Sequence, residues 1–224
     1  MAADQPPVIA IDGPSASGKG TVAQWVAGAL GFHYLNSGAL YRTVAMAALE
    51  AGADLNDAKT LSEITANLRA DFRGDHVTLG GRDVTEAIVA EAVSVAASRI
   101  AAIPGVRKSL LERQRAFRRP PGLVADGRDM GSVVFPDATL KIYLTASLEE
   151  RAKRRYKQLM EKGMDATMAA LLRDIRERDQ RDTMRATAPL QRSANAVLID
   201  TTGMTAADAA AQVLVLYRQA PRVP

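Results

Sequence analysis

Apolar residues occur along the chain in short runs, separated by longer segments that have the apolar spacing of helices. The first run, residues 8–12, ends at the turn-forming pair Gly13 and Pro14 and predicts a buried parallel strand. From Gly18 the apolar residues recur at helical spacing as far as Gly31, and glycine commonly ends helices. The chain therefore begins with a predicted strand, a glycine-containing turn and a helix.

The alternation of strands and helices continues downstream. A second strand is predicted at 32–36 and a helix over 40–51, with Ser37 and Gly38 as a turn or helix cap. Further short apolar runs predict strands at 123–126, 140–144 and 196–200. Strands that alternate with helices favour a parallel sheet covered by helices on both faces. We therefore predict a three-layer α/β fold with about five parallel strands.

Two segments interrupt this alternation. Residues 71–88 contain Gly74-Asp75 and Gly80-Gly81 between β-prone pieces and predict a small antiparallel hairpin. Residues 89–118 are predicted to be helical, with a break near Pro104. Together they suggest an insert at about 60–118. The second segment, 148–185, is rich in arginine and is predicted to form two polar helices that are separated at Gly163.

The composition of the 224 residues excludes several classes of protein. Hydrophobic residues make up 47% and charged residues 24%, which is typical of a globular protein. No apolar run approaches the roughly 20 residues that span a bilayer, and the N-terminus lacks the pattern of a signal peptide. Cysteine is absent and histidine occurs twice, so thiolate and histidine-rich metal sites are excluded. We expect a cytoplasmic protein without a membrane partner.

The formal net charge is +4, and most of the 29 basic residues are arginines. Arginine binds phosphate and carboxylate groups through two parallel hydrogen bonds, which lysine does not do. A compositional bias toward arginine and alanine in the genome is an equally good explanation of the total. The positions of individual arginines therefore have to support any functional argument.

The turn after the first predicted strand has the form Gly-x4-Gly-Lys and leads directly into the first predicted helix. This context is the one that a phosphate-binding loop requires, because glycines allow backbone N–H groups to converge and the helix N-terminus attracts anions. A glycine-rich turn without a ligand is the competing interpretation, but strand, spacing, lysine and helix all agree with the loop. The loop comprises Gly13, Pro14, Ser15, Ala16, Ser17, Gly18, Lys19, Gly20 and Thr21.

Gly20 departs from the general motif, which has Ser or Thr after the lysine to hold Mg²⁺. The Gly-Lys-Gly-Thr form resembles the nucleoside monophosphate kinase branch of phosphate-loop proteins. Position 20 has no hydroxyl, so we expect Mg²⁺ to be held mainly through water and phosphate oxygens. Lys19 is expected to reach the β- and γ-phosphates of ATP.

The absence of one motif and the presence of a second basic region limit the possible functions and phosphate acceptors. The sequence contains no Asn-Lys-x-Asp segment of the kind that binds guanine in GTPases. A phosphate loop together with a second arginine-rich region suggests a kinase for a small anionic acceptor. If the acceptor is itself a phosphate, its oxygen attacks without a general base, and catalysis depends on positioning and charge neutralisation.

Several motifs together resemble bacterial cytidylate kinases over nearly the whole chain. The run Asp126-Gly127-Arg128-Asp129-Met130-Gly131 is more specific than the phosphate loop alone. The other motifs are the phosphate loop, Asn36-Ser37-Gly38-Ala39-Leu40-Tyr41-Arg42, Arg113-Gln114-Arg115, Val134-Phe135-Pro136-Asp137-Ala138 and Arg178-Asp179-Gln180-Arg181-Asp182.

The resemblance implies ATP-dependent phosphorylation of CMP and dCMP by a three-layer phosphate-loop kinase with a monophosphate-binding insert and a short helical lid. It implies nucleotides as the binding partners, without nucleic acid, and we expect a monomer. The implied division is core with phosphate loop at 8–59, insert at 60–118, core at 119–147, lid region at 148–190 and core at 191–218.

The resemblance also implies roles for individual residues. Lys19, Arg128, Arg181 and Arg185 would be catalytic. Ser37, Arg42, Arg128 and Arg185 would bind the acceptor phosphate. Ser98, Arg107 and Asp129 would read the base, since a carboxylate accepts from the cytosine amino group while Ser and Arg donate to its acceptors. Arg178 and Asp182 would lie near the ribose.

Each of these roles has a plainer competitor. In the plainer interpretation of Asp129, this residue pairs with Arg128 or caps the next helix. In the plainer interpretation of Ser98, this residue is only a small polar side chain in an alanine-rich helix. The arginines of 148–185 form a solvated face, with Arg181 and Arg185 as the exceptions.

Two alternatives remain for the activity as a whole. One is a kinase for another small acceptor, namely UMP, AMP or shikimate, which leaves the run 126–131 and the insert unexplained. The other is a nucleic-acid-binding phosphate-loop protein, suggested by charge alone. It lacks a platform for base stacking, because aromatic residues make up only 4% of the chain.

Overall fold

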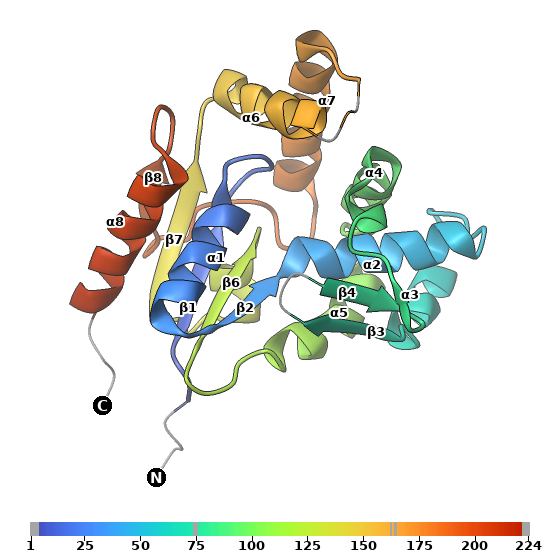
Figure 1. Ribbon diagram of the computed structural model, residues 1–224. Coiled ribbons are helices and arrows are strands. Elements are labelled where there is room, and N and C mark those ends of the chain that lie inside the picture. Colours follow the sequence, from blue (N-terminus) through green and yellow to red (C-terminus); the bar gives the residue numbers. More distant parts are fainter. Residues whose placement is uncertain (1–4, 74–75, 162, 164, 221–224) are drawn as a thin grey trace. The chain divides into compact units, whose positions relative to one another are not determined.

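The computed structural model describes residues 5–220 apart from 74–75, 162 and 164 (Figure 1). The chain divides into two compact units, one comprising 1–35 with 118–224 and the other comprising 36–117. Among the described residues, no helix combines the length and the apolar character needed to cross a bilayer.

The first unit is built on a five-stranded sheet with the strand order β2-β6-β1-β7-β8. β1 runs parallel to β6 and β7, and β7 runs parallel to β8. The predicted α/β fold with five parallel strands is therefore confirmed. The strands are β1 (Val8–Asp12), β2 (His33–Asn36), β6 (Leu123–Gly127), β7 (Leu140–Thr145) and β8 (Val197–Asp200).

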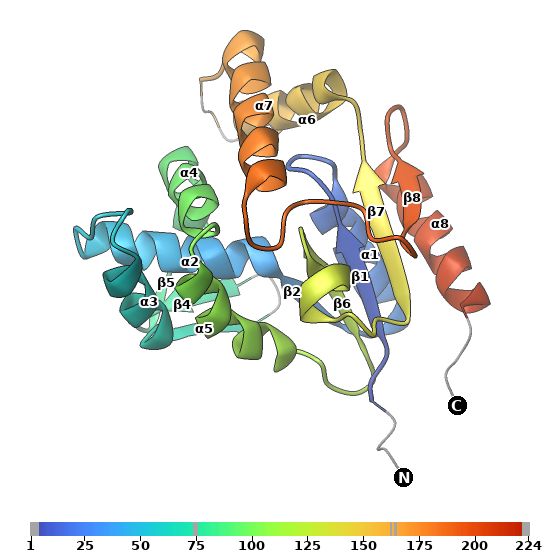
Figure 2. The same ribbon diagram turned by 180° about the vertical axis from the view of Figure 1, so that it is seen from behind.

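Helices cover one face of this sheet because alternate strand residues point to the same side. Ile9 and Ile11 of β1 pack in one buried cluster with α1 (Lys19–Leu30) and α8 (Ala206–Gln219), which lie side by side in Figure 1. Ala10 points to the opposite face. There a π-helix over Met130–Val134, which the sequence pattern did not predict, packs on β1 (Figure 2).

Two polar helices complete the first unit, as predicted for 148–185. They are α6 (Leu148–Glu161) and α7 (Met168–Met184). Ala152 and Leu159 of α6 pack against Leu171 and Ile175 of α7 in a small apolar cluster of their own. Gly163 lies between the two helices and has a φ of 68°, which favours glycine.

The second unit contains α2 (Ser37–Glu50), α3 (Ala58–Ala66), α4 (Glu91–Ile100) and α5 (Pro104–Arg115). α2 packs against α4, and α3 packs against α5. The predicted hairpin is present as β3 (Ala70–Arg73) and β4 (His76–Leu79), and a third antiparallel strand, β5 (Arg82–Asp83), extends it. The turn at 74–75 lies outside the described residues.

This unit differs from the sequence-based expectations in two elements. The helix predicted over 40–51 begins at Ser37, because the side chain of Asn36 accepts a hydrogen bond from Ala39 N at 2.9 Å and so caps it. α3 was not predicted at all. The compact unit begins at Asn36. The division of the chain into core, insert at 60–118 and lid stays a prediction.

Candidate active site

The phosphate loop follows β1 and leads into α1, as predicted. A Cβ atom on Gly13 would lie 2.0 Å from the carbonyl oxygen of Leu144, so only glycine fits beside the end of β7. Gly18 precedes α1 with a φ of 88°, in the left-handed region that glycine adopts without strain. These two glycines give the backbone the path that an anion-binding loop needs.

The phosphate loop contains polar side chains, and some of them lack hydrogen-bond partners among the described residues. Lys19 is buried, and its Nζ donates a hydrogen bond to the carbonyl oxygen of Pro14 at 2.9 Å. Among the described residues, the buried hydroxyls of Ser15 and Ser17 have no hydrogen-bond partner. Buried polar groups are normally satisfied, so these hydroxyls fit a loop that receives a polar ligand.

Lys19 lies in a positively charged environment. Burial lowers the pKa of Lys19 well below its ordinary value, and Arg128 and Arg178 lower it further, while Asp126 and Asp182 act in the opposite direction. The phosphate-loop lysine and two arginines of the predicted acceptor site therefore act on one another electrostatically. A polyanion that enters this region would relieve their repulsion.

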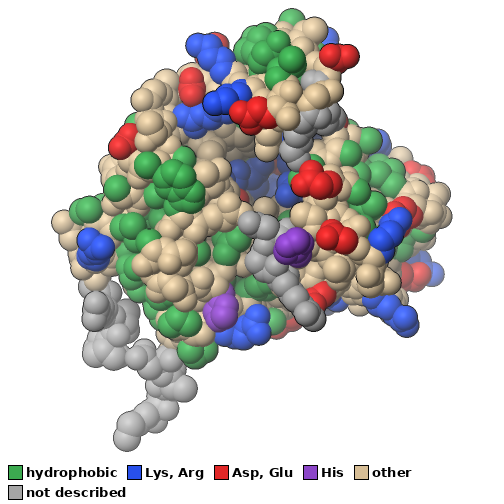
Figure 3. Space-filling model, in the orientation of Figure 1, with side chains coloured by type: hydrophobic (Ala, Val, Ile, Leu, Met, Phe, Trp, Pro, Cys, Tyr) green, Lys and Arg blue, Asp and Glu red, His purple; other side chains and the backbone are tan. Residues whose placement is uncertain are grey.

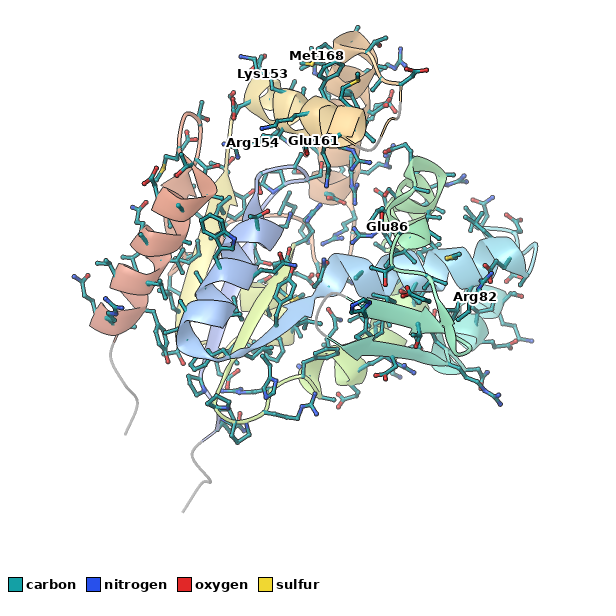
Figure 4. All side chains as sticks on the ribbon, viewed as in Figure 1. Arg82, Glu86, Lys153, Arg154, Glu161 and Met168 are labelled. Carbon is teal, nitrogen blue, oxygen red and sulfur yellow. The ribbon has the colours of Figure 1, made fainter. Side chains whose placement is uncertain are left out.

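Two arginines of α6 bind the outer side of the loop. Arg151 donates to the carbonyl oxygen of Ser15 at 3.3 Å and forms an ion pair with Asp179 of α7 at 2.6 Å. Arg154, labelled on α6 in Figure 4, donates to the carbonyl oxygen of Ser17 at 3.0 Å. The carbonyl groups of Ser15 and Ser17 are thus held by side chains of α6.

The expectation of a solvated arginine face was therefore wrong for Arg151 and Arg154. Arg154 also donates to Oγ1 of Thr201, at 3.0 Å, and to the backbone carbonyl of that residue, after β8. Sequence pattern gave no signal for these contacts, because the arginines stand among many others on a polar helix. Figure 3 shows basic and acidic side chains interspersed over α6 and α7. The pair of Lys157 with Glu161 is exposed, as the interpretation of a solvated face expects, whereas Arg178 and Arg185 are partly buried.

The residues near Gly20 bear on metal binding. A Cβ atom on Gly20 would lie 3.7 Å from Oδ2 of Asp126, whose Oδ1 accepts a hydrogen bond from Tyr34 at 3.1 Å. Among the described residues, no three His, Cys, Asp or Glu side chains are grouped as a metal site. One nearby carboxylate fits an ion such as Mg²⁺ that keeps most of its water and phosphate ligands.

Arg128 and Asp182 form a buried ion pair. Nε of Arg128 donates to Oδ2 of Asp182 at 2.8 Å. Burial by itself raises the pKa of Asp182, but Arg128, Arg178 and Arg185 outweigh it and hold the pKa below its usual range. Asp182 is therefore a carboxylate among three guanidinium groups.

Asp129 is 4% exposed and lies beside Arg185. Oδ1 of Asp129 lies 4.0 Å from Nη2 of Arg185. Asp129 precedes the π-helix without capping it through its side chain, so the capping interpretation of this residue does not hold. Arg181 is more exposed and lies 3.9 Å from Glu177 on the same helix.

In the second unit, Ser37 and Arg42 belong to the first turns of α2. A Cβ atom on Gly38 would lie 3.3 Å from Nη1 of Arg42 and 3.2 Å from Oδ1 of Asn36. The guanidinium group of Arg42 thus lies over the start of the helix, where backbone N–H groups also attract anions. Ser37 is buried at the same helix end.

Arg107 and Ser98 are both buried in the second unit. Nη1 of Arg107 donates to the hydroxyl of Tyr41 at 3.2 Å and to the carbonyl oxygen of Ala101 at 3.3 Å. The guanidinium carbon lies 6.0 Å from the centre of the Tyr41 ring. Tyr41 thus orients Arg107, a role that sequence pattern did not reveal.

The chain is similar to known proteins over nearly its whole length. The family model described as cytidylate kinase matches residues 9–219. A cytidylate kinase of Nitrosomonas europaea is 55% identical over 96% of this chain and 96% of its own length, and one of Bordetella pertussis is 59% identical over 89% of each chain. A solved structure of an uncharacterized protein from Eubacterium ventriosum has a TM-score of 0.50 at 12% identity, covering 96% of this chain and 99% of that chain, and is similar in fold alone.

Proposed function

The chain belongs to the cytidylate kinase family, and on that basis we propose that it transfers the γ-phosphoryl group of ATP to CMP and dCMP, giving ADP with CDP or dCDP. The observation that carries the proposal is the match of the cytidylate kinase family model to residues 9–219, and the mutual influence of Lys19 with Arg128 and Arg178 agrees with it. The phosphate loop and the predicted acceptor residues of the first unit form one positively charged site. Such a site suits a reaction in which both substrates carry phosphate.

Transfer between two phosphates needs little covalent help from the protein. The oxygen of the acceptor phosphate is already anionic, attacks the γ-phosphorus in line, and displaces ADP without transferring a proton to the enzyme. Lys19 would stabilise the charge on the β- and γ-phosphates. Arg128 and Arg185 would offset the repulsion between the two polyanions.

The phosphate loop Gly13–Thr21 would hold the phosphates of ATP through its backbone N–H groups. Mg²⁺ would neutralise phosphate charge and would be held mainly by water and phosphate oxygens. Asp126 is the nearby carboxylate able to accept hydrogen bonds from its bound water. Lys19 would exchange its present partner, the carbonyl oxygen of Pro14, for a phosphate oxygen.

The acceptor nucleotide would contact residues of several elements. Ser37 and Arg42 would bind the monophosphate, together with Arg128 and Arg185. Arg178 and Asp182 of α7 would contact the ribose, where a carboxylate accepts hydrogen bonds from hydroxyl groups. Ser98, Arg107 and Asp129 would read the base.

Asp129 would distinguish cytosine from uracil. Its carboxylate accepts hydrogen bonds only, which matches the 4-amino group of cytosine and opposes the oxygen that uracil has at the same place. The buried setting of Asp129 supports this role, because an unmatched acceptor in a dry site costs more than in water.

The region 148–190 would act as a lid. Its closure would bring Arg181 toward the transferring group and exclude water, which limits hydrolysis of ATP. We also propose that the protein is a monomer in the cytoplasm. Size-exclusion chromatography with light scattering would test the oligomeric state.

A coupled assay of ADP formation with CMP, dCMP, UMP, AMP and shikimate as acceptors tests the proposed activity. CMP and dCMP are expected to give the highest kcat/KM. Preference for AMP or shikimate would contradict the proposal. Tight, steeply salt-dependent binding of a polynucleotide without acceptor phosphorylation would favour the nucleic-acid alternative.

A further inference from the structure

Asp12, the last residue of β1, accepts hydrogen bonds with both carboxylate oxygens from a segment that is distant in the sequence. Oδ1 accepts a hydrogen bond from the backbone N–H of Met130, and Oδ2 accepts one from the backbone N–H of Gly131, each at 2.8 Å. Asp12 is 6% exposed. Two short bonds from adjacent N–H groups to one carboxylate fix both the position and the direction of that backbone segment.

The segment that Asp12 holds directly follows Arg128 and Asp129. Register pairing places Asp12 opposite Gly127, so the segment is joined to β1 on both sides of these two residues. The backbone carbonyl of Asp129 is itself bonded by the N–H of Val133 at 2.9 Å. The backbone of Asp129 is thus fixed at its own carbonyl and at the two residues that follow it.

The packing of this segment leaves little room for a different anchor. A Cβ atom on Gly131 would lie 3.2 Å from the side chain of Lys141 and 3.5 Å from Cβ of Ala10. Met130 is 1% exposed. The N–H groups of Met130 and Gly131 therefore need an acceptor within the protein, and the described partner is Asp12.

A buried carboxylate is a costly choice for the end of a strand that packs well with apolar residues. The pKa of Asp12 is raised to about 6, mainly by burial and to a smaller extent by Asp129. The hydrogen bonds from the two backbone N–H groups act in the opposite direction. A carboxylate adds little to the stability of the hydrophobic core. Its two hydrogen bonds instead hold the segment that follows Arg128 and Asp129.

We propose that Asp12 is a positioning residue for the acceptor nucleotide: it fixes the backbone after Asp129 so that the Asp129 carboxylate and the Arg128 guanidinium are held in their binding orientation. This inference rests on the proposed base-reading role of Asp129. Because Asp12 also directly precedes Gly13, the residue joins the phosphate loop to the acceptor-reading segment.

The substitution Asp12→Asn tests this role, since the amide has the same shape but only one oxygen that accepts. We expect the ratio of kcat/KM for CMP to kcat/KM for UMP to fall at least tenfold. Amide hydrogen exchange at Met130 and Gly131 should become at least tenfold faster, while exchange at Ile11 stays unchanged. A residue that merely supports the fold would lower both kcat/KM values together and leave their ratio unchanged.

Asp57→Asn is the matched control, because Asp57 also accepts bonds from two backbone N–H groups, at the start of α3. It should leave the CMP-to-UMP ratio within twofold of the wild type. If Asp129→Ala lowers the ratio and Asp12→Asn does not, the positioning role is overturned while the proposed function stands. If Asp129→Ala leaves the ratio unchanged, the base-reading role fails, and this inference fails with it.

If Asp12→Asn does not fold, the wild type supplies the test. Addition of CMP should slow hydrogen exchange at Met130 and Gly131 more than saturating UMP does, because the anchored segment would tighten when Asp129 binds its matching base. Equal slowing by the two nucleotides would overturn the inference.

Discussion

Nε of Arg128 lies 2.8 Å from Oδ2 of Asp182, which joins the segment after β6 to helix α7. Arg178 and Arg185 also act on this carboxylate and help to hold its pKa below the usual range, against the effect of burial. Asp182 is thus the acid that balances three arginines proposed to bind the acceptor nucleotide. A bound phosphate group would carry the same sign of charge into this cluster.

Asp182→Asn should destabilise the protein by about 3 kcal/mol, because removing one member of a buried ion pair leaves charges uncompensated. Inorganic phosphate should raise the thermal midpoint of this variant more than that of the wild type, since the anion replaces the lost charge. Differential scanning fluorimetry measures both effects. Asp174→Asn on the exposed side of α7 is the control, and an equal response of variant and wild type to phosphate would contradict the charge-balance argument.

Lys19→Met should lower kcat by about 10³-fold or more, because a charge-assisted contact to the transferring phosphoryl group is lost. The thermal midpoint should stay equal or rise, since burial and two arginines disfavour the charged lysine in the folded protein. Steady-state kinetics and fluorimetry measure these effects. Lys153→Met on α6 should retain full activity, and near-normal turnover by Lys19→Met would remove Lys19 from the proposed mechanism (Figure 4).

Asp129→Ala should raise the activity on UMP relative to CMP, by roughly tenfold or more, because the acceptor that opposes the uracil oxygen is removed. The kcat/KM values for both nucleotides at one pH measure the change. Asp174→Ala provides a control at an acid of α7 that is half exposed. An unmoved CMP-to-UMP preference would mean that another residue reads the base.

Asp12 should make the free energy of unfolding depend on pH. Its pKa rises from 3.8 to about 6 on folding, so the folded protein binds the proton more tightly than the unfolded chain between these values. Stability should therefore fall as pH rises from 4 to 7, by on the order of 3 kcal/mol from this group.

Denaturant unfolding at several pH values, compared with Asp12→Asn, isolates that contribution. The advantage of the wild type over the variant should shrink steadily between pH 4 and pH 7. In Asp57 the pKa is lowered by hydrogen bonds from Thr60, so its contribution is lost only below about pH 4. The difference between wild type and Asp57→Asn should accordingly stay constant over pH 5–7. A constant difference for Asp12→Asn as well would contradict the raised pKa.

Gly13→Ala should disrupt the phosphate loop, because the new Cβ would lie 2.0 Å from a backbone oxygen of β7 that cannot move away easily. We expect KM for ATP to rise at least tenfold and the thermal midpoint to fall. Gly28→Ala is the matched control on α1, where a Cβ meets nothing within 4 Å. It should stabilise the helix by about 1 kcal/mol and leave activity unchanged. Equal ATP affinity in the two variants would argue against the close approach at Gly13.

The strands and the phosphate loop could be predicted from the local sequence, because both depend on short-range patterns of residues. An apolar run that ends at glycine predicted β1, and the spacing of Gly13, Gly18 and Lys19 predicted the loop. Local sequence pattern did not predict elements whose stability comes from packing against other parts of the fold. α3 has only a narrow apolar stripe, with Leu61 buried, and is stabilised by packing on α5 and by the Asp57 cap.

The sequence by itself thus predicted the five parallel strands, the phosphate-loop motif and the family-like motif after β6. Only the tertiary structure decided which charged side chains meet. Arg151 and Arg154 look like any exposed arginines in the sequence, and Asp12 like any residue at the end of a strand. Their partners Ser15, Ser17 and Met130 belong to other elements. The energy of such contacts depends on burial and distance in space, which no local pattern encodes.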